Sequence, residues 1–260
     1  MAIIRGTENN DNIENPFPPS NDIVYGGGGN DRFDFGYGKD TVYGGSGDDT
    51  ISSFYGADDG ATAYGESGDD VITVISLDDN KLSGGEGFDS IWGGIGVDTI
   101  LGGNDDDTLF GLNDNDRLYG EEGNDIIVGG YGSDVLSGGN GDDTLSGLRY
   151  NGIDYSNSDT SNDKDMIFGG NGSDTFVLGL SGAKSFHDDN EASDLTYIED
   201  FKSGEDKIQL SGYSFLYTLT GVGSNTNIYL DKGENNENEL IAIVKGNSGL
   251  SLDSSDFTFV

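Results

Sequence analysis

Seven nonapeptides follow one another without interruption over residues 84–146: GGEGFDSIW, GGIGVDTIL, GGNDDDTLF, GLNDNDRLY, GEEGNDIIV, GGYGSDVLS and GGNGDDTLS. Each begins with glycine and carries aspartate at its sixth place and an aliphatic residue at its eighth. A fixed short period of this kind is typical of a solenoid, in which each repeat packs only against its neighbours. The stretch therefore predicts a repeat architecture.

The same frame extends outward, with short inserts, to seventeen blocks that run from 6–14 to 169–177. The eighth place is apolar in every block: Ile13, Val24, Phe33, Val42, Ile51, Ala63, Ile72, Leu82, Ile91, Ile100, Leu109, Leu118, Ile127, Leu136, Leu145, Ile167 and Phe176. Since only 33% of the residues are hydrophobic, chance does not produce this register. The sixth place is aspartate except in two blocks, which have Ala61 and Asn80.

The spacing predicts an all-β fold with parallel strands. Glycine at places 1, 2 and 4 permits positive φ angles, so places 1 to 6 are expected to form a turn and places 7 to 9 a three-residue strand. Strand side chains alternate, so the eighth place points inward and its neighbours outward. One strand cannot bury its single apolar side chain alone. With two blocks per coil, stacked coils form two sheets over a narrow aliphatic core, and blocks n and n+2 lie on the same side.

Composition restricts the partners of the chain. Its 260 residues include 49 acidic and 12 basic side chains, and the net charge of -37 argues against a nucleic-acid partner because such a surface repels phosphate. Aspartate outnumbers glutamate 37 to 12, and aspartate with glycine is typical of tight turns and hard-cation sites. There is no cysteine, and no apolar run approaches the roughly 20 residues of a transmembrane helix.

The stacked aspartates point to a divalent cation. In blocks n and n+2 the sixth-place carboxylates come close together, and like charges repel unless a cation lies between them. Ca²⁺ accepts six to eight oxygen ligands at about 2.3–2.6 Å, which glycine carbonyls can help to supply, whereas Mg²⁺ demands strict octahedral geometry. The candidate ligands are Asp11, Asp22, Asp31, Asp40, Asp49, Asp70, Asp89, Asp98, Asp107, Asp116, Asp125, Asp134, Asp143, Asp165 and Asp174.

The pattern G-G-x-G-x-D-x-U-x resembles the hemolysin-type calcium-binding repeat of RTX proteins. The resemblance implies a right-handed parallel β-roll with Ca²⁺ bound between successive turns. It also implies that carbonyls at places 1, 2 and 4 bind the ion beside the sixth-place carboxylates. In the three most regular blocks these places are Gly84, Gly85, Gly87, Gly93, Gly94, Gly96, Gly138, Gly139 and Gly141.

Sorting the blocks by parity, with 6–14 as the first, predicts an asymmetry. The odd blocks carry sixth-place aspartate without a gap, whereas the even blocks are interrupted at Ala61 and Asn80. We therefore expect a nearly complete row of calcium ions on the odd side and a broken row on the even side. Roughly ten ions in total are expected.

The ninth place of the even blocks is mostly aromatic and is predicted to face outward: Tyr25, Tyr43, Tyr64, Ser83, Leu101, Tyr119, Ser137 and Phe168. These rings are expected to stack and stabilise neighbouring strands. The alternative is a flat platform for a glycan or a partner protein.

The repeat ends before 178–260. Within that region Ile198–Leu210 resembles the segment that caps the roll in many RTX proteins, and a cap protects exposed sheet edges. By that resemblance Asp200 and Asp206 are candidates for a last calcium site, with solvated surface acids as the alternative. Strand-like runs follow at Phe215–Thr220, Asn227–Leu230 and Glu239–Val244.

Residues Ser251–Val260 are similar to an uncleaved type I secretion signal, although an edge strand would also fit them. The start, MAIIRG, shows no cleavable signal. We therefore expect export without signal cleavage, to the outside or the surface of a Gram-negative-type bacterium, cyanobacteria included. The expected domains are a calcium-binding roll over 1–177, with a loop insertion at about 147–159, and a capping region over 178–260.

No catalytic constellation is evident. His187 is the single histidine, and the sequence has neither a cysteine nucleophile, nor a G-x-S-x-G elbow, nor a phosphate-binding loop. Two noncatalytic functions remain. One is a calcium-loaded structural or surface-layer protein. The other is a calcium-dependent adhesin or carbohydrate-binding module that uses the aromatic row to bind a cell-surface polysaccharide.

Overall fold

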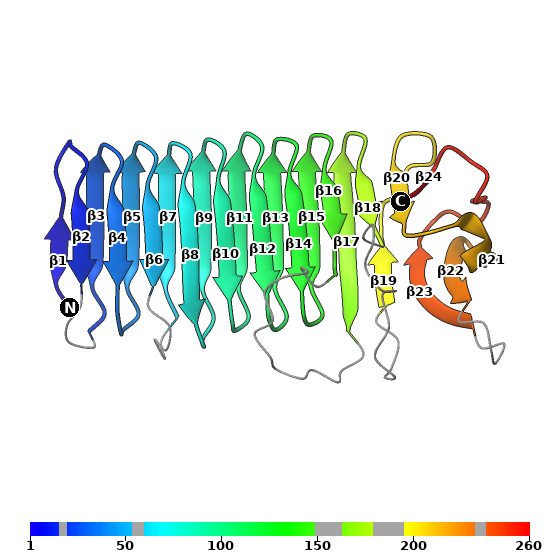
Figure 1. The fold of residues 1–260 in the computed structure, drawn as a ribbon, viewed down its shortest axis with the longest axis horizontal. Coiled ribbons are helices and arrows are strands. Elements are labelled where there is room, and N and C mark those ends of the chain that lie inside the picture. Colours follow the sequence, from blue (N-terminus) through cyan, green and yellow to red (C-terminus); the bar gives the residue numbers. More distant parts are fainter. Residues whose placement is uncertain (16–19, 54–59, 149–162, 179–194, 232–237) are drawn as a thin grey trace.

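Two long β-sheets, A and B, lie face to face along an elongated solenoid (Figure 1). The computed structural model describes residues 1–15, 20–53, 60–148, 163–178, 195–231 and 238–260. The chain alternates between the sheets, so successive blocks contribute strands to opposite faces. This confirms the all-β parallel solenoid.

Sheet A contains, in spatial order, β1 (Ile3–Arg5), β3 (Ile23–Gly28), β5 (Thr41–Ser46), β7 (Thr62–Ser67), β9 (Lys81–Glu86), β11 (Thr99–Asn104), β13 (Arg117–Glu122), β15 (Val135–Asn140), β17 (Lys164–Asn171), β19 (Leu195–Ile198), β23 (Asn238–Val244), β22 (Asn225–Asp231) and β21 (Tyr217–Val222). Sheet B contains β2 (Asn12–Asn15), β4 (Arg32–Phe35), β6 (Thr50–Ser53), β8 (Val71–Ser76), β10 (Ser90–Gly94), β12 (Thr108–Leu112), β14 (Ile126–Gly130), β16 (Thr144–Ser146), β18 (Thr175–Val177), β20 (Lys207–Leu210) and β24 (Phe257–Phe259). A 3₁₀ turn, η1 (Ser214–Leu216), precedes β21.

The register confirms two nonapeptides per coil. Ile100 of β11 pairs with Leu118 of β13, which pairs with Leu136 of β15. Blocks n and n+2 are therefore neighbours in one sheet. We call the turns from sheet A to sheet B, which carry Asp11 to Asp174, the odd edge. The turns from sheet B to sheet A, which carry Asp22 to Asp165, form the even edge.

Most strands of the roll are longer than the three residues predicted. β11 spans six residues, places 7 to 9 of one block and places 1 to 3 of the next, and Gly103 and Asn104 still pair with Glu121 and Glu122. The prediction was wrong because a parallel ladder uses backbone N–H and C=O groups, which glycine retains. Only places 4 to 6 are left for the turn.

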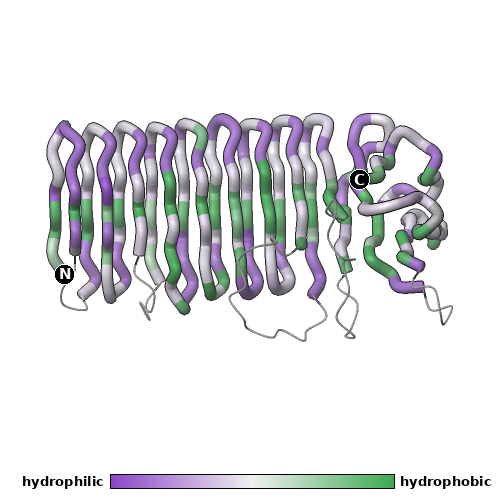
Figure 2. Tube along the Cα trace, in the orientation of Figure 1, coloured by the Kyte–Doolittle hydropathy of each residue, from purple (hydrophilic) through white to green (hydrophobic). Residues whose placement is uncertain are grey.

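The core is one side chain wide per sheet. Eighth-place residues such as Leu118 and Ile127 are completely buried. Figure 2 shows that hydrophobic segments recur from coil to coil along the solenoid. Ile13, in the first block, is only partly buried. Such a thin core buries little apolar area per coil, so the turns must contribute to stability.

The C-terminal region continues both sheets. Ile198 of β19 pairs with Ile167 and with Val244 of β23, and sheet A then turns antiparallel through β22 and β21. β24 adds the last strand to sheet B through Ile208 and Phe257. The strand-like runs after residue 214 are thus confirmed, except that the first one begins at Tyr217 because Phe215 and Leu216 belong to η1. DFTFV contains the edge strand β24. None of the residues described here belongs to a helix that could cross a membrane.

Candidate metal centre

The sixth-place carboxylates link successive coils through the backbone. Asp89 N donates to Asp107 Oδ1 over 2.8 Å, and Asp107 N donates to Asp125 Oδ1 over 2.8 Å. On the odd edge this link repeats from Asp11 to Asp174, and on the even edge from Asn80 to Asp165. One oxygen of each carboxylate, Oδ1, therefore holds the preceding coil by a hydrogen bond.

The second oxygen, Oδ2, is different. It is buried and has no hydrogen-bond partner in the described structure at Asp31, Asp49, Asp70, Asp89, Asp98, Asp107, Asp116, Asp125, Asp134, Asp143 and Asp174. Burying an acceptor without a donor costs about 1–3 kcal/mol, and more for a charged group. A row of such atoms requires either protons or cations.

Each Oδ2 lies next to the first glycine of its own block, at the place where a side chain of that glycine would start. A Cβ built on Gly93 would come within 2.9 Å of Gly111 O, and still closer to Asp98 Oδ2. The same crowding recurs at Gly102, where Gly120 O at 2.9 Å and Asp107 Oδ2 would meet the added atom, and at Gly138. A carboxylate oxygen and a backbone carbonyl thus face one small space that no donor occupies, and a side chain there would fill it.

The other glycines bring further carbonyls close. Places 2 and 4 have positive φ in the regular blocks: Gly85 (129°), Gly87 (118°), Gly94 (106°), Gly96 (101°), Gly139 (124°) and Gly141 (134°). A Cβ on Gly85 would meet Glu66 O, the second-place carbonyl of the preceding coil, and one on Gly87 would meet Gly68 O at the fourth place. Close approach of the coils therefore depends on these glycines.

Burial raises the pKa of these carboxyls. Desolvation raises the pKa of Asp98 and of Asp107 to about 8. For Asp116 desolvation and then the neighbouring Asp98 and Asp134 raise the pKa to about 10. Without a cation the folded rows thus retain protons near neutral pH. In the described residues no three carboxylates converge, and each position combines a carboxylate with carbonyls, a donor set that suits a hard cation such as Ca²⁺.

Comparison with protein families agrees with this geometry. The model of the RTX calcium-binding nonapeptide repeat matches four times, at residues 19–36, 76–109, 110–145 and 159–180. The chain carries RTX calcium-binding repeats. No curated protein matches the sequence.

Two solved structures resemble the RTX roll described here. They are the R3 and R2 subunits of the AlgE6 mannuronan C5-epimerase from Azotobacter vinelandii, each 23% identical to this chain. The R3 match covers 60% of this chain and 80% of the subunit with a TM-score of 0.23, and the R2 match covers 61% and 91% with a TM-score of 0.24.

The RTX rows differ between the two edges. The odd row is continuous, and Asp11, at its start, accepts Thr7 N over 2.6 Å. In the even row Asp22 N donates to Asp40 Oδ1 over 2.8 Å, but Ala61 offers no carboxylate. Asp40 N instead donates to Gly38 O over 2.9 Å. The backbone link between sixth places is therefore missing between Asp40 and Ala61, whereas at Asn80 it persists, and the broken row of calcium ions stays a prediction.

The odd row extends into the C-terminal region. Asp206 accepts Asp174 N over 3.1 Å and Lys202 N over 2.7 Å, and its part in a last calcium site stays a prediction. Asp200 lies elsewhere and accepts the N–H groups of Gly169 and Gly170. Lys202 Nζ donates to Gly170 O over 2.5 Å, so an ammonium group binds a second-place carbonyl at this end of the roll.

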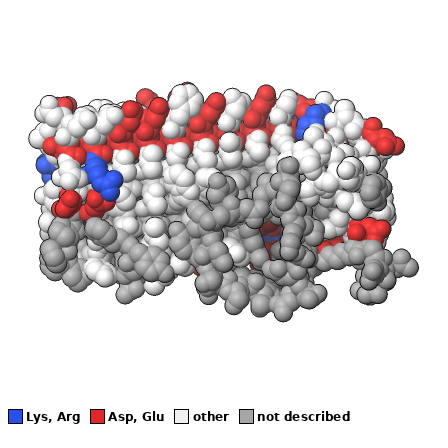
Figure 3. Space-filling model, in the orientation of Figure 1, with Lys and Arg blue, Asp and Glu red and all other residues white. Residues whose placement is uncertain are grey.

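A second row of side chains was not predicted. At the fifth place of the odd blocks, Asp48 N donates to Asn30 Oδ1, Asp69 N to Asp48 Oδ1 and Phe88 N to Asp69 Oδ1, over 2.9–3.1 Å. Asp106, Asn124 and Asp142 continue the pattern. Figure 3 shows acidic side chains gathered along this edge, at the top of the view. The signal in the sequence was the recurrence of asparagine and aspartate at place 5.

The aromatic row stacks as expected. The ring centroids of Tyr25 and Tyr43 lie 4.9 Å apart and those of Tyr43 and Tyr64 5.0 Å, with planes within 12°. The guanidinium group of Arg5 covers Tyr25 at 4.4 Å. A second stack, Trp92 with Phe110 at 5.5 Å on sheet B, was not predicted.

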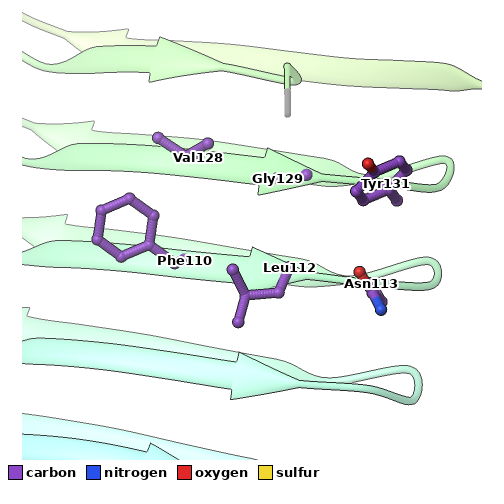
Figure 4. A pocket seen from close by; sticks show the side chains of 7 residues that line it. Phe110, Leu112, Asn113, Val128, Gly129 and Tyr131 are labelled. Carbon is purple, nitrogen blue, oxygen red and sulfur yellow. The ribbon is translucent and has the colours of Figure 1, made fainter. Parts of the chain in front are cut away.

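A small pocket lies beside Phe110 on the outside of sheet B. Figure 4 shows Phe110 and Leu112 of β12 and Val128 of β14 around it, with Asn113 and Tyr131 at the strand ends. No carboxylate lines it, although Gly129 and Gly130, the first two places of the block that carries Asp134, form part of its wall. His187 and the inserted residues 149–159, both singled out in the sequence, lie outside the described residues.

Proposed function

We propose that this chain is an extracellular calcium-binding protein whose RTX roll folds when Ca²⁺ binds between the glycine and aspartate turns, and that the folded roll has a structural or surface-associated role. The observation that carries the proposal is the row of buried Oδ2 atoms, most of which share a small space with a first-place carbonyl. Calcium would supply positive charge and accept these oxygens as ligands.

The ligands would be the sixth-place carboxylates together with carbonyls at places 1, 2 and 4. About ten divalent ions would offset much of the net charge of -37. Where calcium is scarce, repulsion among the aspartates keeps the chain from closing its turns. Extracellular calcium-binding modules have dissociation constants of about 10⁻⁴–10⁻³ M, so folding would follow export. RTX repeats are consistent with secretion, and we propose type I export and a noncatalytic role.

A calcium titration of the metal-free protein, followed by circular dichroism with Mg²⁺ as the control, tests this function. The expected result is a transition from disorder to β-structure that Ca²⁺ alone produces at millimolar concentration or below. A metal-free protein that is already fully β-structured and ignores calcium would overturn the proposal.

The alternative function is a calcium-dependent adhesin that binds polysaccharide through the aromatic row. A sugar-binding platform needs ring faces open to the ligand. In Tyr25, Tyr43 and Tyr64 the faces cover one another, and Arg5 covers the outer face of Tyr25. This stacking favours the structural role. A glycan array with and without calcium distinguishes the two functions, because an adhesin would retain a defined sugar only when calcium is present.

A further inference from the structure

Asn80 provides an amide at the sixth place of its block, where every other block except that of Ala61 provides a carboxylate. Its Oδ1 accepts Ala61 N over 2.9 Å, so it forms the same link to the preceding coil as an aspartate would. Ser76 Oγ also donates to this oxygen over 2.9 Å. Its Nδ2 donates to Gly93 O over 3.1 Å and to Asp98 Oδ1 over 2.9 Å. The amide is buried, and all its polar atoms are partnered.

Asp98, the next sixth-place residue of the even row, shows what this amide replaces. There Asp98 Oδ2 and Gly111 O face the same space above Gly93, and Asp98 Oδ2 has no donor in the described residues. Gly93 O is the first-place carbonyl of the block two after Asn80, just as Gly111 O is for Asp98. Asn80 Nδ2–H therefore occupies the position between side chain and carbonyl that is empty of donors at Asp98.

The hydrogen-bond partners fix the orientation of the amide. With Nδ2 and Oδ1 exchanged, an N–H group would face the N–H of Ala61, and the oxygen would face Gly93 O and Asp98 Oδ1. Two acceptor pairs and one donor pair would then be buried without a hydrogen bond, which is unfavourable for every group involved. Only the observed orientation places a proton toward Gly93 O, the first-place carbonyl that a cation would otherwise bind.

We propose that the side-chain amide of Asn80 takes the place of a calcium ion in the even row. The turn that carries Asn80 then packs between the turns of Ala61 and Asp98 without a metal ion. This inference rests on the proposed function, because it assumes that the ordinary rungs bind calcium. The neutral amide also removes one negative charge from the row, and the neighbouring Ala61 removes another. The odd edge of the same coils keeps Asp70 and Asp89, and with them the need for calcium.

The substitution Asn80→Asp tests this directly in the full-length chain. Calcium is counted by native mass spectrometry and by calorimetry, at saturating concentration and after circular dichroism has shown folding. Asn80→Asp is expected to bind about one ion more than the parent protein, because it restores the second oxygen of the rung. The matched control is Asp89→Asn on the opposite edge of the same coils, which is expected to bind about one ion fewer.

A crystal of the unaltered protein in which Tb³⁺ replaces Ca²⁺ gives a second measurement that does not depend on a variant folding. Anomalous density is expected beside Asp89 and Asp107 and is expected to be missing between Asn80 and Gly93. Full occupancy at Asn80, or an Asn80→Asp protein that folds with calcium but binds no additional ion, would overturn the inference. An unaltered protein that binds no calcium at all would instead overturn the proposed function.

Discussion

Asp98 N donates a 2.7 Å hydrogen bond to Asp116 Oδ1, and Asp116 N donates in turn to Asp134 Oδ1 over 2.8 Å. Each carboxylate thereby has two tasks, since Oδ1 holds the preceding coil while Oδ2 is left for a cation or a proton. The two tasks can be separated by substitution.

Asp116→Asn should keep the backbone link and remove the cation ligand. We expect it to bind about one calcium ion fewer but to hold more β-structure than the parent protein when calcium is absent, since an amide carries no charge to desolvate. Asp116→Ala loses the link as well, which costs roughly another 1 kcal/mol. Ion counting and urea unfolding with and without chelator measure these effects, and equal behaviour of the two variants would contradict the division of tasks.

The metal-free protein should gain structure on acidification. Desolvation by burial is the main cause that raises the folded-state pKa of Asp125 to about 6, of Asp89 to about 7 and of Asp107 to about 8. The charges of neighbouring aspartates add to this shift. The unfolded value is about 3.9, so between about pH 4 and about pH 8 the folded state binds more protons and its stability falls as pH rises. Calcium needs the deprotonated carboxylates, so its affinity should fall below about pH 7.

Circular dichroism in chelator between about pH 8 and about pH 4 measures the first effect, and calcium titrations at several pH values measure the second. A metal-free protein that loses structure on acidification over this window would contradict the buried state of the aspartates.

The eighth place should dominate the packing energy. Leu118 is completely buried, and Leu118→Ala is expected to destabilise the calcium-loaded protein by about 2–5 kcal/mol. Leu101, at the ninth place of the adjacent coil, is only partly buried, and Leu101→Ala is expected to cost less than about 1 kcal/mol. Chemical denaturation of both variants at saturating calcium compares them, and similar losses would show that the inward row is not the core.

Glu121 occupies a second place with φ of 80°, where most blocks have glycine. Glu121→Gly should stabilise the folded protein by up to about 1 kcal/mol, because a side chain is strained in this region. The control is Glu122→Gly, which removes the same charge at a residue without positive φ and should cost about 0.5–1 kcal/mol. Thermal unfolding of both proteins gives the sign, and a loss of stability in Glu121→Gly would rule out strain.

The tyrosine stack should contribute to stability. Tyr43 contacts a ring on each side, and Tyr43→Ser is expected to cost about 1–3 kcal/mol. Tyr119, whose row neighbours are Leu101 and Ser137, serves as the comparison and should cost less when changed to serine. Calcium-loaded unfolding measures both. A glycan ligand whose binding depends on Tyr43 while stability does not would favour the adhesin.

The sequence predicted the buried core best, because burial there depends on a single side chain in each block. The eighth place predicted the core because a stacked coil has a single inward position per strand, and Leu118 and Ile127 follow this rule. It was least informative about backbone extent, since glycine was interpreted as turn while Gly103 continues the ladder. The parity argument located the gap at Ala61, but the partners of Asn80 depend on a 3.1 Å contact with Gly93 that no spacing reveals.

The pairing of Ile100 with Leu118 has a consequence for how such a molecule can change in length. A deletion or duplication of eighteen residues within 84–146 returns every strand to its own sheet and shifts the C-terminal region by one strand spacing, about 4.8 Å. A change of nine residues would exchange the two faces and present the wrong sheet to β19 and β20. The length of the roll can therefore change only in whole coils if the fold is to be kept. Any gain or loss of repeats must involve an even number of nonapeptides.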